Sequence, residues 1–162
     1  GKIGQAVAHL LEPFGVNVGY HDPFADVPGY TRLELDDLMG WADVITLHCP
    51  KTENGAPLLD LGRLSLMRPG SIILNIARGG LIDEKALLGL LTAGHLAGAA
   101  LDCFTKEPYD GPLKEMDNVI LTPHMAFYSD TALFDCLRIA CQNLTYYLNG
   151  EHDKVNRFVP RE

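Results

Sequence analysis

The sequence lacks the features that mark several large classes of protein. It has no apolar run long enough to cross a membrane, so we expect no membrane-spanning segment and no membrane partner. Its 13 Lys and Arg residues are outnumbered by 21 Asp and Glu residues, and they form no basic patch. Because a surface that follows a phosphate backbone needs such a patch, we expect no nucleic-acid partner. It also holds no internal repeat and no low-complexity segment.

Cysteine is sparse, and none of the four thiols belongs to a C-x-x-C pair. Cys49, Cys103, Cys136 and Cys141 fall in segments with the pattern of strand and helix interiors. We therefore expect four buried free thiols in a reducing cytoplasm, with no disulfide and no metal site. The chain has 162 residues, of which 47% are hydrophobic, and this is enough for one globular domain with a sizeable core.

Strand and helix patterns alternate along the chain. Short apolar runs predict strands at 16–20, 30–33, 44–47, 71–77, 98–101 and 119–121. Apolar residues at helical spacing, with capping residues, predict helices at 1–14, 35–41, 60–67, 83–93 and 129–148. The run 44–47 is expected to be buried on both faces of a sheet. This alternation predicts an α/β fold with a parallel sheet and helices on both sides.

Polar side chains stand at the ends of the predicted strands. Five of them follow an apolar strand closely, namely Asp22, His48, Arg78, Asp102 and His124. In an open parallel sheet, ligands bind beyond the carboxyl ends of the strands. The sequence therefore predicts a functional cleft along one edge of the sheet.

The chain opens with Gly1, Lys2, Ile3 and Gly4 at the start of the first predicted helix. The two glycines have the spacing of the last two in the dinucleotide fingerprint G-x-G-x-x-G. The first would let the backbone approach a pyrophosphate, and the second would let the helix pack closely on a strand. A plain turn is an equally simple interpretation of so short a pattern.

Asp22 favours the dinucleotide interpretation. It lies at the end of the next predicted strand, where a carboxylate can accept both hydroxyls of an adenosine ribose. No Lys or Arg lies between His21 and Tyr30 to hold a 2′-phosphate, so the residues favour NAD over NADP. The alternative is that Asp22 and Pro23 simply form a turn.

Three blocks of sequence resemble the D-isomer-specific 2-hydroxyacid dehydrogenases. They are residues 75–84 (NIARGGLIDE), residues 98–104 (GAALDCF) with Glu107-Pro108 after them, and residues 118–124 (NVILTPH). The shorter runs 20–23 and 47–50 also fit, and the order of the blocks is that of the family. The resemblance covers nearly the whole chain. It implies a Rossmann-like, doubly wound parallel sheet that binds NAD.

The resemblance also implies catalytic roles. Arg78 would bind the substrate carboxylate, for which a guanidinium fork offers two parallel hydrogen bonds. His124 would be the acid/base, and Glu107 would orient its ring and favour its charged form. Together they would support hydride transfer between NAD(H) and C2 of a small 2-hydroxy acid or 2-oxo acid. The structural alternatives are a surface ion pair for Arg78, a satisfied structural histidine for His124 and a solvated loop charge for Glu107.

The same resemblance implies a set of cofactor contacts. Asp102 would hold the nicotinamide carboxamide, and His48 and Pro50 match a loop near the cofactor's ribose and phosphates. A strand-end cap and a shaped turn are the respective structural alternatives. The full expected set is Gly1, Lys2, Ile3, Gly4, Asp22, Pro23, His48, Cys49, Pro50, Ala77, Arg78, Asp102 and His124.

The chain departs from the family pattern at its start. The family's first strand, with the first fingerprint glycine, is absent before Gly1; it would be the central strand, between 16–20 and 44–47. The substrate domain is absent as well. We therefore expect residues 1–149 to be an NAD-binding domain without its first strand, and 150–162 to be a crossing segment toward a substrate domain, returning at 155–160. The isolated chain is predicted to fold poorly and show no turnover, and the full-length parent to be a cytoplasmic homodimer.

Two other functions stay open. A formate dehydrogenase of the same superfamily would carry glutamine in place of Glu107, which argues against it. A dinucleotide-sensing protein like the family's transcriptional corepressors can keep the arginine, glutamate and histidine, so these residues do not separate it from an enzyme. The regulatory tails of those corepressors are absent here. The aromatic run 124–129 (HMAFYS) is similar to lactate-type members, but it does not fix the substrate.

Overall fold

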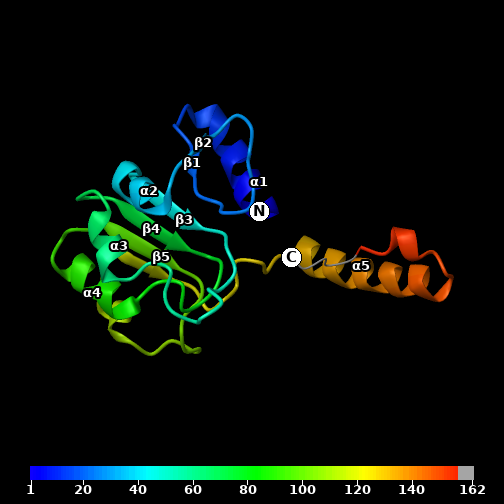
Figure 1. Ribbon diagram of the computed structural model, residues 1–162. Coiled ribbons are helices and arrows are strands. Elements are labelled where there is room, and N and C mark those ends of the chain that lie inside the picture. Colours follow the sequence, from blue (N-terminus) through cyan, green and yellow to red (C-terminus); the bar gives the residue numbers. More distant parts are fainter. Residues whose placement is uncertain (157–162) are drawn as a thin grey trace. The chain divides into compact units, whose positions relative to one another are not determined.

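The computed structural model describes residues 1–156 (Figure 1). It divides into two compact units, the first covering residues 1–124 and the second beginning at residue 125. The first unit contains all the strands that are described and the residues predicted to form the site.

The elements of the first unit fall within the predicted segments, except for a short 3-10 helix at 112–115 that was not predicted. Its helices are α1 (Lys2–Leu11), α2 (Leu35–Trp41), α3 (Leu61–Leu66) and α4 (Glu84–Thr92), with the short 3-10 helices η1 (Glu12–Phe14) and η2 (Pro112–Glu115). Its strands are β1 (Gly19–Tyr20), β2 (Thr31–Arg32), β3 (Val44–Leu47), β4 (Ile72–Asn75), β5 (Gly98–Leu101) and β6 (Val119–Leu121). Most bounds agree with the prediction to within two residues, but 16–20 yields only the two-residue β1.

The strands form two parallel ladders. Four of them make one sheet in the order β3-β4-β5-β6, and β1 and β2 pair separately. In the larger sheet, Ile45 pairs with Ile73 and Ile73 with Ala99, so these side chains share one face. The α/β class and the parallel sheet are therefore confirmed.

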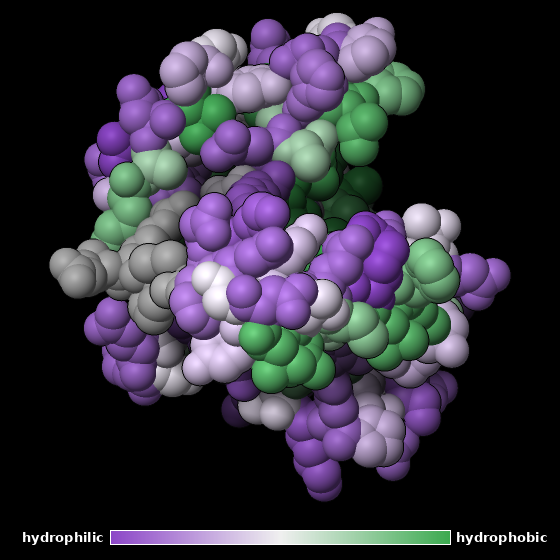
Figure 2. All heavy atoms as spheres, turned by 90° about the vertical axis from the view of Figure 1, so that its right-hand side faces the viewer, coloured by the Kyte–Doolittle hydropathy of each residue, from purple (hydrophilic) through white to green (hydrophobic). Residues whose placement is uncertain are grey.

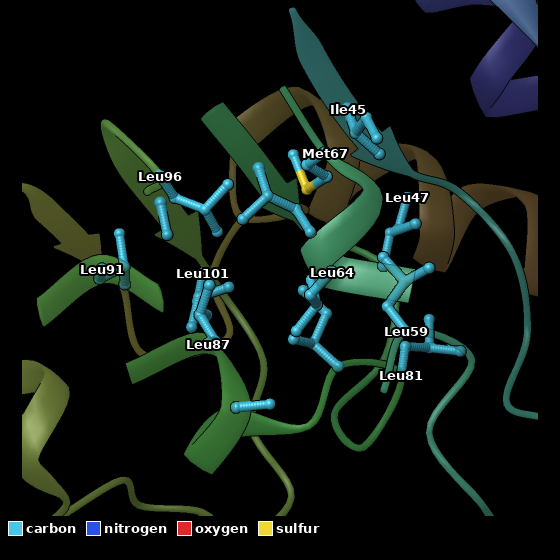
Figure 3. Packing of buried hydrophobic residues seen from close by; sticks show 14 of the residues in the cluster. Ile45, Leu47, Leu59, Leu64, Met67, Leu81, Leu87, Leu91, Leu96 and Leu101 are labelled. Atoms are coloured by element: carbon cyan, nitrogen blue, oxygen red, sulfur yellow. The ribbon is translucent and has the colours of Figure 1, made fainter. Parts of the chain in front are cut away.

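The core lies on one face of the larger sheet. Figure 3 shows Ile45 and Leu47 of β3 packed among leucines from the helical layer, including Leu64 of α3 and Leu87 of α4. Leu64 and Leu87 are fully buried, and shortening either to alanine would cost about 2–5 kcal/mol of folding stability.

The opposite face is partly open. Val44 of β3 is 57% exposed and Ile72 of β4 is 39% exposed. The prediction that 44–47 is buried on both faces is therefore wrong. Helix α1 also keeps its apolar side chains at the surface, and none of its residues is buried. A periodic pattern shows which residues can form an apolar face, but burial needs a second element packed against that face.

Local side-chain chemistry explains where the helices begin and end. Asp60 caps α3 by accepting a hydrogen bond from the amide of Arg63, and Asp83 caps α4 by accepting from the amides at 85 and 86. Gly15 follows η1 with a φ of +67°, and Gly94 follows α4 with a φ of +70°. Glycine adopts this left-handed conformation without a Cβ penalty.

The second unit consists of α5 (Asp130–Leu148) and η3 (His152–Lys154). The predicted apolar face of α5 is exposed, since Leu137 is 70% and Leu144 is 60% accessible. Figure 2 shows hydrophobic side chains lying among hydrophilic ones on the face turned toward the viewer. Residues 157–162 lie outside the described part, and with them most of the predicted return at 155–160. None of the helices in residues 1–156 combines the length and hydropathy needed to cross a membrane.

The four cysteines are free thiols, but they are not all buried. Cys103 is buried and Cys49 is half-buried, whereas Cys136 and Cys141 are exposed on α5. The prediction of burial is therefore wrong for the last two. Their spacing along the helix predicted a buried face, but no part of the described structure covers these two side chains.

Candidate active site

The ends of the parallel strands bring the predicted residues to one edge of the sheet. His48 directly follows β3, Arg78 lies three residues after β4, Asp102 directly follows β5 and His124 lies three residues after β6. Because adjacent parallel strands end at the same edge, these four residues share it. Asp22 lies two residues after β1, in the smaller sheet.

His124 and Glu107 form a polar pair at this edge. Nδ1 of His124 lies 2.9 Å from Oε2 and 3.1 Å from Oε1 of Glu107. The His124 hydrogen bond is the main cause that holds the pKa of Glu107 below its usual value, and a hydrogen bond from the amide of Phe104 acts in the same direction. The carboxylate is therefore charged at neutral pH, and Nε2 is the ring nitrogen on the side away from it.

The backbone at His124 is unusual. Its φ is +53°, in the left-handed region where side chains other than glycine are uncommon. Such a conformation costs on the order of 1 kcal/mol or more, and it persists only where the surroundings impose it. The turn after β6 thus aims the imidazole toward Glu107 at some cost in backbone energy.

A pocket of about 550 Å³ adjoins this pair. Its walls are mostly apolar, with Phe104, Pro108, Tyr109, Leu121, Pro123, Thr122 and Lys114 joining His124 and Glu107. The rings of Phe104 and Tyr109 stack with their centroids 4.5 Å apart, which fixes one wall. The pocket thus offers apolar surface beside an acid/base pair that stays accessible to solvent, with 45% of the His124 side chain and 38% of the Glu107 side chain exposed.

Asn75, at the end of β4, shapes the loop that carries Arg78. Its Nδ2 donates to the carbonyl oxygen of Arg78 at 2.9 Å, and its Oδ1 accepts from the amide of Ala77 at 3.1 Å. Only 2% of Asn75 is exposed. Arg78 itself is exposed, and its Nη1 donates to the carbonyl oxygen of Ala77. The sequence analysis named Asn75 only as part of a motif; the available signal was an amide residue ending an apolar strand.

Gly79 joins the Arg78 loop to the loop of Glu107. A Cβ at Gly79 would lie 1.7 Å from the carbonyl oxygen of Phe104, so no other residue fits there without displacing the backbone. The contact brings the segment after β4 against the segment after β5. Only glycine permits this close approach.

The charged groups at this edge affect the pKa of the Cys103 thiol. Burial is the main cause that raises the pKa of Cys103 to about 11. The negative charges of Asp102 and Glu107 raise it further, whereas the positive charge of Arg78 opposes them. All three charged groups are thus within electrostatic reach of one sulfur atom. The close approach of Gly79 to Phe104 and the hydrogen bond between His124 and Glu107 bring the segments that carry Arg78, Glu107 and His124 together.

Asp102 is buried, with 3% of its surface exposed. One of its carboxylate oxygens accepts a hydrogen bond from the Thr122 hydroxyl at 2.5 Å, and its backbone amide donates to the carbonyl oxygen of Asn75 at 2.9 Å. Thr122 was not predicted as a functional residue, and here it holds Asp102 in place. Contact between Asp102 and a nicotinamide carboxamide stays a prediction.

A second group of predicted residues meets at the start of α1. Gly1 is the N-cap of this helix and provides no side-chain cap, and an ideal Cβ on Gly4 would lie 3.6 Å from Cβ of His48. Oδ2 of Asp22 lies 3.3 Å from the Gly1 nitrogen. A helix start, a carboxylate and an imidazole are therefore close together. Of the other predicted residues here, Lys2, Ile3, Pro23 and Pro50 are exposed.

The ionisation of this second group follows from its contacts. Burial acts to raise the pKa of Asp22, whereas hydrogen bonds from the amides of Phe24 and Ala25 act to lower it, and the pKa is lowered overall. Burial lowers the pKa of His48 and raises that of Cys49. The site thus offers an anionic carboxylate, a neutral imidazole and a protonated thiol.

Arg32 also reaches this group, which the sequence analysis did not anticipate. Pairing of Tyr20 with Arg32 between β1 and β2 brings the arginine beside Asp22, where its Nη2 donates to the Asp22 carbonyl oxygen at 3.0 Å. Arg32 lies just beyond the segment from His21 to Tyr30, which has no Lys or Arg to hold a 2′-phosphate. The parallel pairing of two short strands, which sequence does not reveal, places it there.

Residues 1–156 contain no convergent group of three or more His, Cys, Asp or Glu side chains that could hold a metal ion. The start of α1 fits a dinucleotide instead. Amides at a helix N-terminus suit a pyrophosphate, and an anionic carboxylate close by suits a ribose diol.

Comparison with known proteins connects this geometry to a family. The profile described as D-isomer specific 2-hydroxyacid dehydrogenase, NAD binding domain, matches residues 1–126. The chain is 45% identical over 131 residues to the D-3-phosphoglycerate dehydrogenase of Mycobacterium tuberculosis H37Rv, covering 77% of this chain and 25% of that protein.

Two solved structures show the same fold with different cofactors. D-lactate dehydrogenase with NAD⁺ from Lactobacillus jensenii matches at a TM-score of 0.88 and 29% identity, over 99% of this chain and 53% of that one. The NADPH-dependent glyoxylate/hydroxypyruvate reductase of Sinorhizobium meliloti, in complex with NADP and malonate, matches at 0.85 and 32% identity, over 91% and 47%. The chain thus spans about a quarter of the length of the Mycobacterium tuberculosis protein and about half of each of these two solved chains.

Proposed function

The chain belongs to the family of D-isomer-specific 2-hydroxyacid dehydrogenases, and we propose that the full-length protein transfers a hydride between NAD(H) and C2 of a D-2-hydroxy acid or its 2-oxo acid. The observation that supports this most is the 2.9 Å contact between His124 and Glu107, at the sheet edge that also carries Arg78. An imidazole held at Nδ1 by a carboxylate is suited to take or give a proton at Nε2.

The cofactor would bind across the carboxyl ends of the strands, beginning at α1. Backbone amides from Gly1 to Gly4 would face the pyrophosphate, and the anionic Asp22 would accept the ribose hydroxyls. The other expected contacts are Pro23, His48, Cys49, Pro50 and Ala77. Asp102, held by Thr122, would hold the carboxamide. When bound, the nicotinamide supplies the carbon that accepts or donates the hydride.

The residues of this chain would manage the substrate and its proton. Arg78 would hold the substrate carboxylate through two parallel hydrogen bonds. In oxidation, Nε2 of His124 takes the hydroxyl proton while the hydride leaves C2, and Glu107 stabilises the imidazolium that forms. In reduction, the imidazolium returns that proton to the carbonyl oxygen as the hydride arrives at C2.

The finer assignments are parts of the same proposal. NAD is preferred to NADP because Asp22 is anionic at neutral pH, and an anionic carboxylate at the ribose repels a 2′-phosphate. The four free thiols fit a reducing cytoplasm. Assembly as a homodimer rests on the family resemblance alone.

A steady-state assay of the full-length protein with NADH and a panel of 2-oxo acids tests the proposal. We expect turnover with at least one of these acids, and His124→Ala should lower kcat by about 10²–10⁴-fold with NADH affinity little changed. Tight NADH binding without turnover on any 2-oxo acid would indicate a dinucleotide sensor instead. Full activity in His124→Ala would refute the assignment of the acid/base.

A further inference from the structure

Glu84 makes a contact that the proposed chemistry does not use directly. Its Oε1 accepts a hydrogen bond from the backbone amide of Thr105 at 2.7 Å, across 21 positions of sequence. Glu84 is the first residue of α4, and Thr105 lies two residues before Glu107. We propose that Glu84 is a positioning residue, which fastens the loop of Glu107 so that its carboxylate meets His124. This inference rests on the function proposed above.

The contact from Glu84 adds to those that already hold the loop of Glu107, such as the close approach of Gly79 to Phe104. Residues 102–111, between β5 and η2, contain no helix and no strand. The side chain of Glu107 is 38% exposed, so packing alone does not fix it. An irregular segment keeps one conformation only when its backbone groups find fixed partners.

A continuous set of contacts leads from Glu84 to the imidazole. Glu84 holds the amide of Thr105, and the amide of the preceding residue, Phe104, donates to Oε1 of Glu107 at 3.0 Å. The same carboxylate faces Nδ1 of His124. Loss of the hydrogen bond between Glu84 and the Thr105 amide would therefore let the Glu107 carboxylate move away from Nδ1 of His124.

The carboxylate of Glu84 is not required to cap its own helix. Asp83 already accepts hydrogen bonds from the amides at 85 and 86. The remaining structural explanation is electrostatic, because a negative charge near a helix N-terminus stabilises the helix. Substitution can separate the effect of the negative charge of Glu84 from the effect of its side-chain length. Glutamine keeps an acceptor oxygen at the same distance but has no charge, whereas aspartate keeps the charge but is one methylene shorter.

The test compares Glu84→Gln, Glu84→Asp and, as a control, Lys85→Ala at the exposed next position of α4, all in the full-length protein. Hydrogen exchange of the Thr105 amide, followed by NMR, should rise about tenfold in Glu84→Asp and stay near wild type in Glu84→Gln and Lys85→Ala. With a 2-oxo acid substrate, kcat should fall about tenfold in Glu84→Asp and be retained in Glu84→Gln, with NADH affinity unchanged in both.

The opposite ranking would overturn the inference. If Glu84→Gln is the impaired variant and Glu84→Asp behaves as wild type, the residue acts through its charge on α4. Equal Thr105 exchange in both variants would also contradict it. If the wild-type protein shows no turnover, the proposed function fails, but the exchange ranking still decides the role of Glu84.

Discussion

Nδ1 of His124 lies 2.9 Å from Oε2 of Glu107, although the two residues come from different loops, one after β6 and one after β5. Each loop therefore helps to hold the other. Because the contact uses Nδ1 and the carboxylate, the geometry orients the imidazole before any substrate is bound. Preorganisation of this kind is what a positioned acid/base requires.

The contact predicts a pH-dependent contribution to stability. The pKa of Glu107 is lowered in the folded state, chiefly by His124, so in the acidic range the unfolded chain binds more protons. The stabilisation is then present above the unfolded pKa and is lost as pH falls through the folded one. In urea unfolding between about pH 3 and pH 7, the advantage of wild type over Glu107→Gln should shrink toward acid. An advantage that grows toward acid would contradict this sign.

The close approach of Gly79 to Phe104 predicts opposite effects for two Gly→Ala changes. Gly79→Ala should destabilise the fold by about 1–3 kcal/mol or more, because the added Cβ meets backbone atoms. Gly89→Ala in α4, where a Cβ meets nothing within 4 Å, should stabilise it by up to about 1 kcal/mol. Thermal unfolding of both variants checks the pair. A Gly79→Ala protein as stable as wild type would show that the two loops are not in close contact.

Asn75 is expected to act on substrate binding through the loop of Arg78. Asn75→Ala removes the hydrogen-bond partner of the Ala77 amide and of the Arg78 carbonyl oxygen, and KM for the 2-oxo acid should rise about tenfold. Ser71→Ala is the matched control, because Ser71 stands at the other end of β4, is also 2% exposed and also donates to a carbonyl oxygen. Both variants should lose about 1–3 kcal/mol of stability. If Asn75→Ala and Ser71→Ala have the same KM for the 2-oxo acid, Asn75 does not act on substrate binding through the loop of Arg78.

Asp22 and Arg32 together predict a shift in cofactor preference. Asp22→Ala should weaken NADH binding about tenfold and remove the repulsion of a 2′-phosphate, so the ratio of NADPH to NADH affinity should rise. Because Arg32 lies beside Asp22, adding Arg32→Ala should reverse part of that rise. Fluorescence titration with both cofactors measures the ratio. An unchanged ratio in Asp22→Ala would show that this carboxylate does not face the ribose.

Local patterns in the sequence predicted the elements and the edge where the site lies. The helix expected at 83–93 is α4, from Glu84 to Thr92, because a capping aspartate and a terminal glycine mark its two ends. Asp102 and His124 were placed correctly at the sheet edge, since a polar residue after an apolar run marks the end of a strand.

What depends on contacts between distant segments could not be predicted in this way. Arg32 meets Asp22 only because β1 and β2 pair, and Thr122 was not connected with Asp102. The predictions of burial were wrong for the same reason at Val44, which lies in an apolar run, and at Cys136, which follows the helical pattern, because no described element covers either side chain.

The most direct test follows the hydride itself. The full-length protein is incubated with NADH carrying deuterium at both positions of C4 of the nicotinamide and with each 2-oxo acid, and the product is analysed by NMR and chiral chromatography. The account predicts a D-2-hydroxy acid with deuterium at C2, formed by wild type and barely by His124→Ala. Bound NADH that keeps its deuterium with every 2-oxo acid, or a product of the L-configuration, would contradict it.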